Sequence, residues 1–182
     1  MNLPRLRQPH SRKAIPMQHD SITTSDIHIR NADRRDLPRL KAYFEGLSDL
    51  ARRNRFHVPV KTIRDDLVEF MLNRSRCAMI AEDKRDNSIV GEAVMAVEPE
   101  GERAETGLSV AEGWRGRGLG DKLLRELEKR AKAVGARVIY GDMLGGNALM
   151  KKLAQRREYE IVRTPGDWSL SRFRKKLAVW RG

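Results

Sequence analysis

The segment Trp114-Arg115-Gly116-Arg117-Gly118-Leu119-Gly120-Asp121 constrains this chain most, because its three glycines stand between a predicted strand, Ala104 to Val110, and a predicted amphipathic helix, Leu119 to Val134. Glycine lets the backbone turn tightly and leaves neighbouring amides uncovered by a Cβ atom. The first N–H groups of a helix have no intrahelical partner and carry the positive end of its dipole. The segment therefore predicts a phosphate-binding site, with Arg115 and Arg117 adding positive charge.

Two common phosphate-binding motifs do not fit this segment. A Walker loop needs Gly-Lys-Ser/Thr, whereas Gly120 is followed by Asp121. A dinucleotide-binding Gly-x-Gly-x-x-Gly motif would need its third glycine at Asp121 or Leu123, and only Asp142 could serve as its ribose-binding acid. What remains is the spacing Arg115-x-x-Gly118-x-Gly120, or a glycine-rich basic turn without a special function.

This Arg-x-x-Gly-x-Gly spacing resembles the pyrophosphate loop of the GNAT superfamily of acyl-CoA-dependent N-acyltransferases. A second match follows the predicted buried strand Arg137 to Met143, where Asn147 opens a helix. GNAT proteins have small or apolar residues three and six positions after this asparagine and a Gly-Phe pair at the far end of the helix. Here those positions hold Met150, Leu153 and Glu158-Tyr159, so the aromatic residue is kept in kind and the glycine is not. The resemblance covers about residues 27 to 175.

From residue 27 onward, the hydrophobic pattern predicts the element order β-α-α-β-β-β-α-β-α-β-β, which matches the GNAT topology. The implied fold class is α/β (α+β), with a mixed, mostly antiparallel central sheet of six or seven strands. This sheet is splayed between strands 4 and 5 and is flanked by about four helices. The first helix is expected from about Arg35 to Gly46, and the second from Thr62 onward, with a polar connection over residues 48–60. The side chains expected to face inward from the second helix are Ile63, Leu67, Phe70 and Met71.

The domain organisation follows from composition. Residues 26–182 are expected to form a single domain of ordinary size. Residues 1–25 contain three prolines and no acid before Asp20, so they are expected to form a flexible basic tail.

The resemblance implies acetyl-CoA as the cosubstrate and a site for it. Backbone amides of the fourth strand would hold the pantetheine arm and polarise the thioester carbonyl, while amides of the glycine-rich loop would hold the pyrophosphate. The residues implied for acetyl-CoA binding are Leu108, Ser109, Val110, Arg115, Gly116, Arg117, Gly118, Leu119, Gly120, Asp121 and Asn147.

Two carboxylates are candidates for the catalytic base. Glu105 lies in the middle of the fourth strand, and Asp142 ends the fifth strand beside the same gap. A partly buried carboxylate there could take the ammonium proton of the acceptor directly or through water. The structural alternative is that Glu105 pairs with a neighbouring arginine.

The general acid has no candidate in the sequence. Many GNAT enzymes carry a tyrosine seven positions after the helix asparagine, and here this position is Ala154. Tyr140 and Tyr159 are near in sequence but are expected to be core residues.

The predicted function is transfer of an acetyl group from acetyl-CoA to a primary amine, most simply a protein lysine. Ala104-Glu105-Thr106, Asn147-Ala148-Leu149-Met150 and the arginine-rich segment 50–60 resemble the bacterial protein-lysine acetyltransferase branch. The alternatives are acetylation of a small-molecule amine and a non-catalytic acyl-CoA-binding regulator. The sequence leaves the acyl-chain length open, and it is compatible with a monomer or a homodimer.

The net charge and the content of aromatic residues, histidine and cysteine indicate which classes of partner and ligand to expect. The formal net charge of +12 favours anionic partners, such as a protein with an acidic surface. Nucleic acid is a remote alternative, because only 5% of residues are aromatic and no stacking platform is visible. The four histidines, His10, His19, His28 and His57, have no metal-ligand spacing, so no metal is expected. A single cysteine and the lack of a long apolar run predict a cytoplasmic protein without membrane contact.

Overall fold

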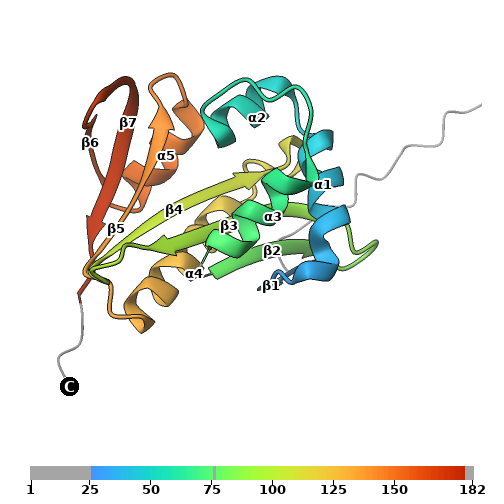
Figure 1. Ribbon diagram of the computed structural model, residues 1–182, viewed down its shortest axis with the longest axis horizontal. Coiled ribbons are helices and arrows are strands. Elements are labelled where there is room, and N and C mark those ends of the chain that lie inside the picture. Colours follow the sequence, from blue (N-terminus) through green and yellow to red (C-terminus); the bar gives the residue numbers. More distant parts are fainter. Residues whose placement is uncertain (1–25, 76, 179–182) are drawn as a thin grey trace, which may run out of the picture.

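The computed structural model describes residues 26–75 and 77–178, and the expectation of a flexible tail over residues 1–25 falls outside this part. A seven-stranded sheet runs through it in the order β1-β2-β3-β4-β5-β7-β6 (Figure 1). All neighbouring strands are antiparallel except β4 and β5. The strands are β1 (Ile27–Asn31), β2 (Cys77–Asp83), β3 (Ile89–Val97), β4 (Arg103–Val110), β5 (Val138–Leu144), β6 (Glu160–Thr164) and β7 (Asp167–Lys176). The predicted mixed, mostly antiparallel fold is confirmed.

The parallel pair β4–β5 is short. It has three residue pairs in register, which end at Glu105 opposite Tyr140. Beyond this point β5 continues beside β7 only, and β4 continues beside β3 only. The predicted splay between strands 4 and 5 is therefore confirmed.

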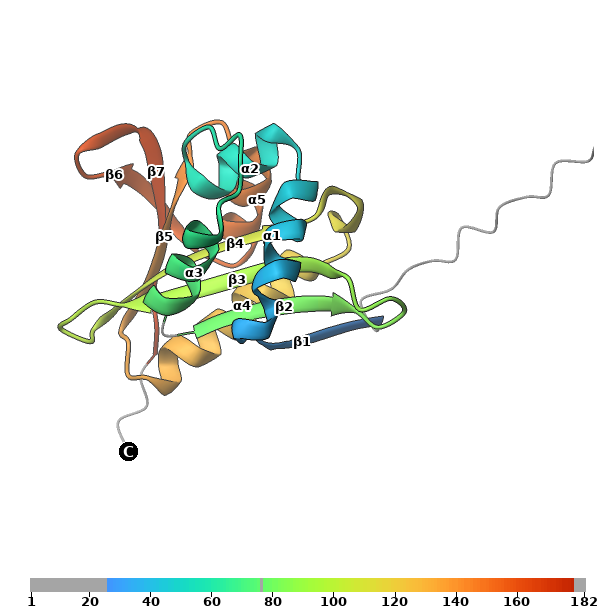
Figure 2. The ribbon, with the colours of Figure 1, turned by 45° about the vertical axis from the view of Figure 1, so that its right-hand side comes forward.

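Helices cover both faces of the sheet (Figures 1 and 2). One core joins the first three helices to the sheet, and a second core joins α4 and α5 to its other face. The helices are α1 (Leu37–Gly46), α2 (Asp49–Phe56), α3 (Asp65–Arg74), α4 (Leu119–Ala133) and α5 (Ala148–Arg156).

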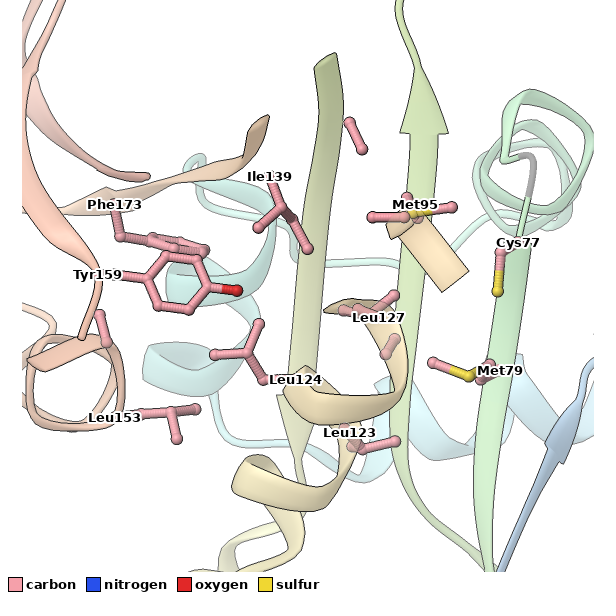
Figure 3. Close-up of a cluster of buried hydrophobic side chains, with 14 of the residues drawn as sticks. Cys77, Met79, Met95, Leu123, Leu124, Leu127, Ile139, Leu153, Tyr159 and Phe173 are labelled. Carbon is pink, nitrogen blue, oxygen red and sulfur yellow. The ribbon is translucent and has the colours of Figure 1, made fainter. Parts of the chain in front are cut away.

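The core around α4 is built by one stripe of its leucines (Figure 3). Leu123, Leu124 and Leu127 are fully buried, and they contact β-sheet residues such as Met79 and Ile139. Spacings of three and four residues place such side chains on one side of a helix. This stripe explains why the sequence pattern found α4 at its observed position.

The number of helices was underestimated, because the predicted polar connection over residues 48–60 contains α2. The Ser48 side chain accepts a hydrogen bond from Ala51 N–H and caps the start of this helix. The helix ends at His57, whose φ of 64° is left-handed. This conformation costs a non-glycine residue about 1 kcal/mol.

The start and the inward face of α3 also differ from expectation. The helix begins at Asp65 rather than Thr62, so Ile63 is buried but precedes it. Val68 is the residue that α3 buries fully, whereas Phe70 is 56% exposed. Phe70 was predicted to face inward because Ile63 was counted as part of the helix. The first helix is also shorter than expected, since Arg34–Asp36 form a 3₁₀ turn before α1.

Candidate active site

A cleft of about 720 Å³ opens where β4 and β5 separate. It begins at the loop before α4, passes along β4 and reaches α2 and α3. Because α4 and α2 lie on opposite faces of the sheet, the cleft connects the two faces.

The glycine-rich loop forms one end of the cleft. Gly116 and Gly118 have φ values of 75° and 82°, and an added Cβ at either position would meet nothing within 4 Å. Gly118 directly precedes α4, and within residues 26–75 and 77–178 no side chain caps this helix. The first helical hydrogen bond runs from Lys122 N–H to the Gly118 carbonyl. The amides of residues 119–121 therefore lack intrahelical partners, which makes this end of α4 suited to an anion.

The polar side chains around this loop have defined positions. Arg115 Nε donates to the Val110 carbonyl at 3.1 Å, and the Arg117 guanidinium lies 5.4 Å from the ring centre of Trp114. Asp121 accepts a hydrogen bond from Arg125, and Asn147 accepts one from Met150 N–H and caps α5. Arg115, Asp121 and Asn147 line the cleft, but Arg117 does not.

The free edge of β4 forms the wall of the cleft. Leu108, Ser109 and Val110 line it in the stretch where β4 has no partner on the β5 side. In a strand, alternate residues direct their backbone N–H and C=O groups toward the same edge, and on a free edge these groups have no partner strand to bind. At the point of separation, a Cβ on Gly141 would lie 2.4 Å from the Thr106 carbonyl oxygen and 2.4 Å from Phe173 Cζ. Glycine at this position allows the close approach of β5 to β4.

A buried network of polar side chains contacts β4 at Ser109. Arg55 Nε donates to Glu92 Oε1 at 2.6 Å, and Ser109 Oγ donates to the same oxygen at 2.7 Å. The Tyr43 hydroxyl lies 2.9 Å from Ser109 Oγ. Glu92 is 1% exposed, so the network joins α2 to β3 and β4 in the interior. The sequence analysis did not predict the Arg55–Glu92 ion pair, although Glu92 is the one acidic residue in the otherwise apolar strand β3.

The two predicted carboxylates have different surroundings. Glu105 is exposed, lines the cleft and, within the described part of the chain, has no hydrogen bond or ion pair. Asp142 also lines the cleft but accepts two hydrogen bonds from Arg172, both at 2.8 Å, and one from Thr164. Burial alone would raise the pKa of Asp142, but these hydrogen bonds and the charge of Arg172 outweigh it and lower the pKa. Glu105 is thus the carboxylate that is available for a substrate.

His57 is a cleft residue that sequence reasoning did not select. It lines the cleft together with Glu105 and Asp142. Burial is the main cause that lowers its pKa below the ordinary 6.5, with a further contribution from Arg55. No spacing in the sequence signals this position, because α2 was not predicted.

A sequence model described as the Acetyltransferase (GNAT) family matches residues 42–159 of this chain. The chain belongs to the GNAT acetyltransferase family. It is therefore an acetyl-CoA-dependent N-acetyltransferase, and the predicted membership of the GNAT superfamily is confirmed. No match was found among curated proteins.

Solved structures support the GNAT fold. The GNAT domain of PAT from S. lividans aligns with a TM-score of 0.74 at 20% identity, over 83% of this chain and 90% of that chain. A ribosomal-protein-alanine N-acetyltransferase from Brucella melitensis gives a TM-score of 0.65 at 26% identity, over 82% and 99%. A phosphinothricin acetyltransferase from Sinorhizobium meliloti in complex with acetyl-CoA gives 0.66 at 18% identity, over 84% and 89%.

Tyr140 and Tyr159, the two tyrosines near the Asn147 helix in sequence, are both buried in this GNAT protein. Tyr140 donates to Glu98 at 2.6 Å, and the guanidinium groups of Arg103 and Arg172 lie 4.7 and 4.5 Å from its ring centre. Tyr159 is 4% exposed and packs against Phe173, so both are core residues as expected. Ala154, in the position of the usual tyrosine, is fully buried.

Neither a metal cluster nor a membrane span is found in the described ranges. Among these residues, no group of three or more His, Cys, Asp or Glu could hold a metal ion. Likewise, within residues 26–75 and 77–178, no helix is both long and apolar enough to cross a bilayer.

Proposed function

We propose that this GNAT enzyme acetylates the side-chain amine of a protein lysine, with Glu105 as the group that accepts the amine proton. The observation that carries the proposal is one continuous cleft, which joins the glycine-rich loop before α4 to the Glu105 carboxylate on β4, which has no ion pair with any residue of the described ranges. A donor phosphate and a reacting amine can therefore occupy the same cleft at its two ends.

The loop end of the cleft fits the pyrophosphate of acetyl-CoA. Its glycines have no Cβ that would cover the amides, and an added Cβ at Gly116 or Gly118 would meet only open space. The amides of residues 116–121 would hold the phosphates, and Arg115 would add charge at the edge. Leu108, Ser109 and Val110 would align the pantetheine arm along the free edge of β4, and Asn147 would face it from α5. When bound, acetyl-CoA supplies the thioester that is to be cleaved.

The other end of the cleft suits a cationic amine. Glu105 faces α2 from the middle of β4, and Arg55 lies over Gly107, the next residue on the same face. The carboxylate would attract the ammonium and take its proton directly or through water. Asp142 is the weaker candidate, because its oxygens already bind Arg172 and Thr164.

The net charge of +12 and the arginine-rich α2 favour an acceptor lysine on an acidic protein surface. The second candidate acceptor is a small amine with an apolar body. Apolar side chains at the α2–α3 end of the cleft favour it, namely Phe56, Leu67, Phe70 and Met71.

Calorimetric titration with acetyl-CoA tests the donor site. In the Gly118→Glu, Gly120→Glu double variant, two carboxylates would occupy the anion site, so binding should be lost. Gly135→Glu is the matched control, because Gly135 has a φ of 83° and open space around its Cβ position but lies at the far end of α4. Absence of binding to the folded wild type would overturn the proposal. Acetylation of lysine in an aspartate-rich peptide, compared with free small amines, then separates the two acceptor classes.

A further inference from the structure

We propose that His57 is a second base of this site, which takes up a proton from the acceptor amine beside Glu105. This inference rests on the proposed function and concerns a residue for which neither the sequence nor the family resemblance predicts a role. His57 directly follows α2 and lines the cleft with residues of β4 and β5.

The backbone holds His57 in place. Its N–H donates to the Arg53 carbonyl at 2.8 Å and closes the last turn of α2. Its left-handed φ of 64° is a conformation that glycine adopts freely and that other residues rarely adopt. The backbone at His57 is therefore strained, and backbone strain of this kind is concentrated at functional sites.

The helix itself is fixed at both ends. Ser48 Oγ donates to Glu112 at 2.6 Å at the start of α2, beside the loop that leads to α4. Near the other end, two residues before His57, Arg55 forms the buried pair with Glu92. The imidazole is thus presented by a helix that the sheet holds on the acceptor side of the cleft.

The imidazole faces both strands that border the gap. It lines the cleft together with Asp142 on β5 and Glu105 on β4. A neutral imidazole has one ring nitrogen with a free lone pair. That nitrogen can take a proton from an amine that enters between His57 and Glu105.

The charged groups around His57 come from four elements. Arg55 lies on α2, Glu105 on β4, Asp142 on β5, and Asp167 and Arg172 on β7. Asp142 is paired with Arg172, and the remaining effect of Asp142 is to raise the pKa of His57. Burial and the Arg55 charge lower the pKa of His57 below 6.5, and the acidic groups oppose this only in part. The ring is therefore neutral near pH 7 and able to accept a proton.

Glu105 takes one proton from the acceptor ammonium, which becomes a neutral amine. The amine nitrogen then bonds to the thioester carbonyl carbon, and His57 takes one of the two remaining nitrogen protons and becomes an imidazolium. The C–S bond breaks, and the departing thiolate takes a proton from water. The products are an amide and a thiol, and Glu105 and the imidazolium release their protons to water at the mouth of the cleft.

The test uses His57→Gly, because glycine suits the left-handed backbone and removes only the imidazole. Thiol release from acetyl-CoA is followed with a lysine in an aspartate-rich peptide as acceptor. We expect kcat/KM to fall by about 10- to 100-fold, within the usual contribution of a general base. The wild-type profile should lose activity as pH falls through the His57 pKa, below 6.5, and this inflection should be absent from the variant. Added imidazole should restore activity at pH values where it is neutral.

His28→Gln is the matched control, since His28 is an exposed histidine on β1, and its kinetics should be unchanged. Unaltered kcat/KM and an unaltered acid inflection in His57→Gly would overturn the proposal. Loss of activity without rescue by imidazole would also overturn it, because His57 would then be structural. Acetyl-CoA affinity should stay within about twofold of wild type in His57→Gly. If the wild type itself fails to bind acetyl-CoA, the proposed function fails first, and the two failures are thereby distinguished.

Discussion

Glu105 on β4 and Tyr140 on β5 are the last two residues that lie opposite each other before the strands separate. Their side chains serve different purposes. Tyr140 is buried and bonded to Glu98, while Glu105 is exposed to the cleft that opens beside it. The proton acceptor proposed for this enzyme is therefore the last residue of β4 that is paired with β5.

Glu105→Gln should lower turnover by about 100-fold or more, because the amide neither attracts an ammonium nor accepts its proton. Acetyl-CoA affinity should stay near that of wild type, since the phosphate loop is untouched. Steady-state kinetics and calorimetry measure the two effects separately. Glu100→Gln, in the turn between β3 and β4, is the control, and equal turnover in both variants would exclude Glu105 as the base.

Arg55→Leu should destabilise the protein by about 3–5 kcal/mol, because Glu92 would remain buried without its cationic partner. Urea unfolding measures the loss. Arg53→Leu on the same helix is the control, since Arg53 is exposed and a change there should stay within about 0.5 kcal/mol. Similar losses in the two variants would show that the Arg55–Glu92 pair adds nothing specific.

Gly141→Ala should destabilise the fold by about 1–3 kcal/mol or more, the range for overpacking in a rigid interior. The new Cβ would lie 2.4 Å from the Thr106 carbonyl oxygen, a backbone atom that cannot rotate away. Gly46→Ala is the control, because nothing lies within 4 Å of its Cβ position. Thermal unfolding of the two variants checks this prediction, and a wild-type Tm for Gly141→Ala would contradict it.

The Asp142–Arg172 pair should make stability depend on pH. The pKa of Asp142 is lower in the folded state than its unfolded value of about 3.9, so its contribution is fully present above that value. The contribution is lost as pH falls through the lower, folded pKa. The difference in unfolding free energy between wild type and Asp142→Asn should thus be constant from pH 7 to about 5 and should shrink below about 3.9. A difference that grows on acidification would contradict this assignment.

Sequence was sufficient where the signals were local. The loop before α4 was predicted because glycines mark left-handed positions, and α4 because its leucines repeat with helical spacing. Glu105 was identified because alternation along β4 places it on one face with Gly107 and Ser109, as the contacts with α2 and β3 confirm.

The features that the sequence did not predict, α2 and the position of His57, depend on contacts between residues far apart in the chain. α2 is short and carries four charged residues among eight, so its composition does not indicate a buried face. Its position depends on Arg55 meeting Glu92, which is 37 residues away, and that pairing has no signature in either segment alone. His57 could not be selected for the same reason, since its place over the gap exists only once α2 is docked.

The cleft passes through the sheet from one layer of helices to the other. A donor held by the amides before α4 and an acceptor admitted beside α2 would thus approach the reacting carbon from opposite sides. The donor and the acceptor would then occupy separate parts of the cleft. Both would be present at once, and we expect the acetyl group to pass directly from the thioester to the amine without a covalent intermediate on the protein.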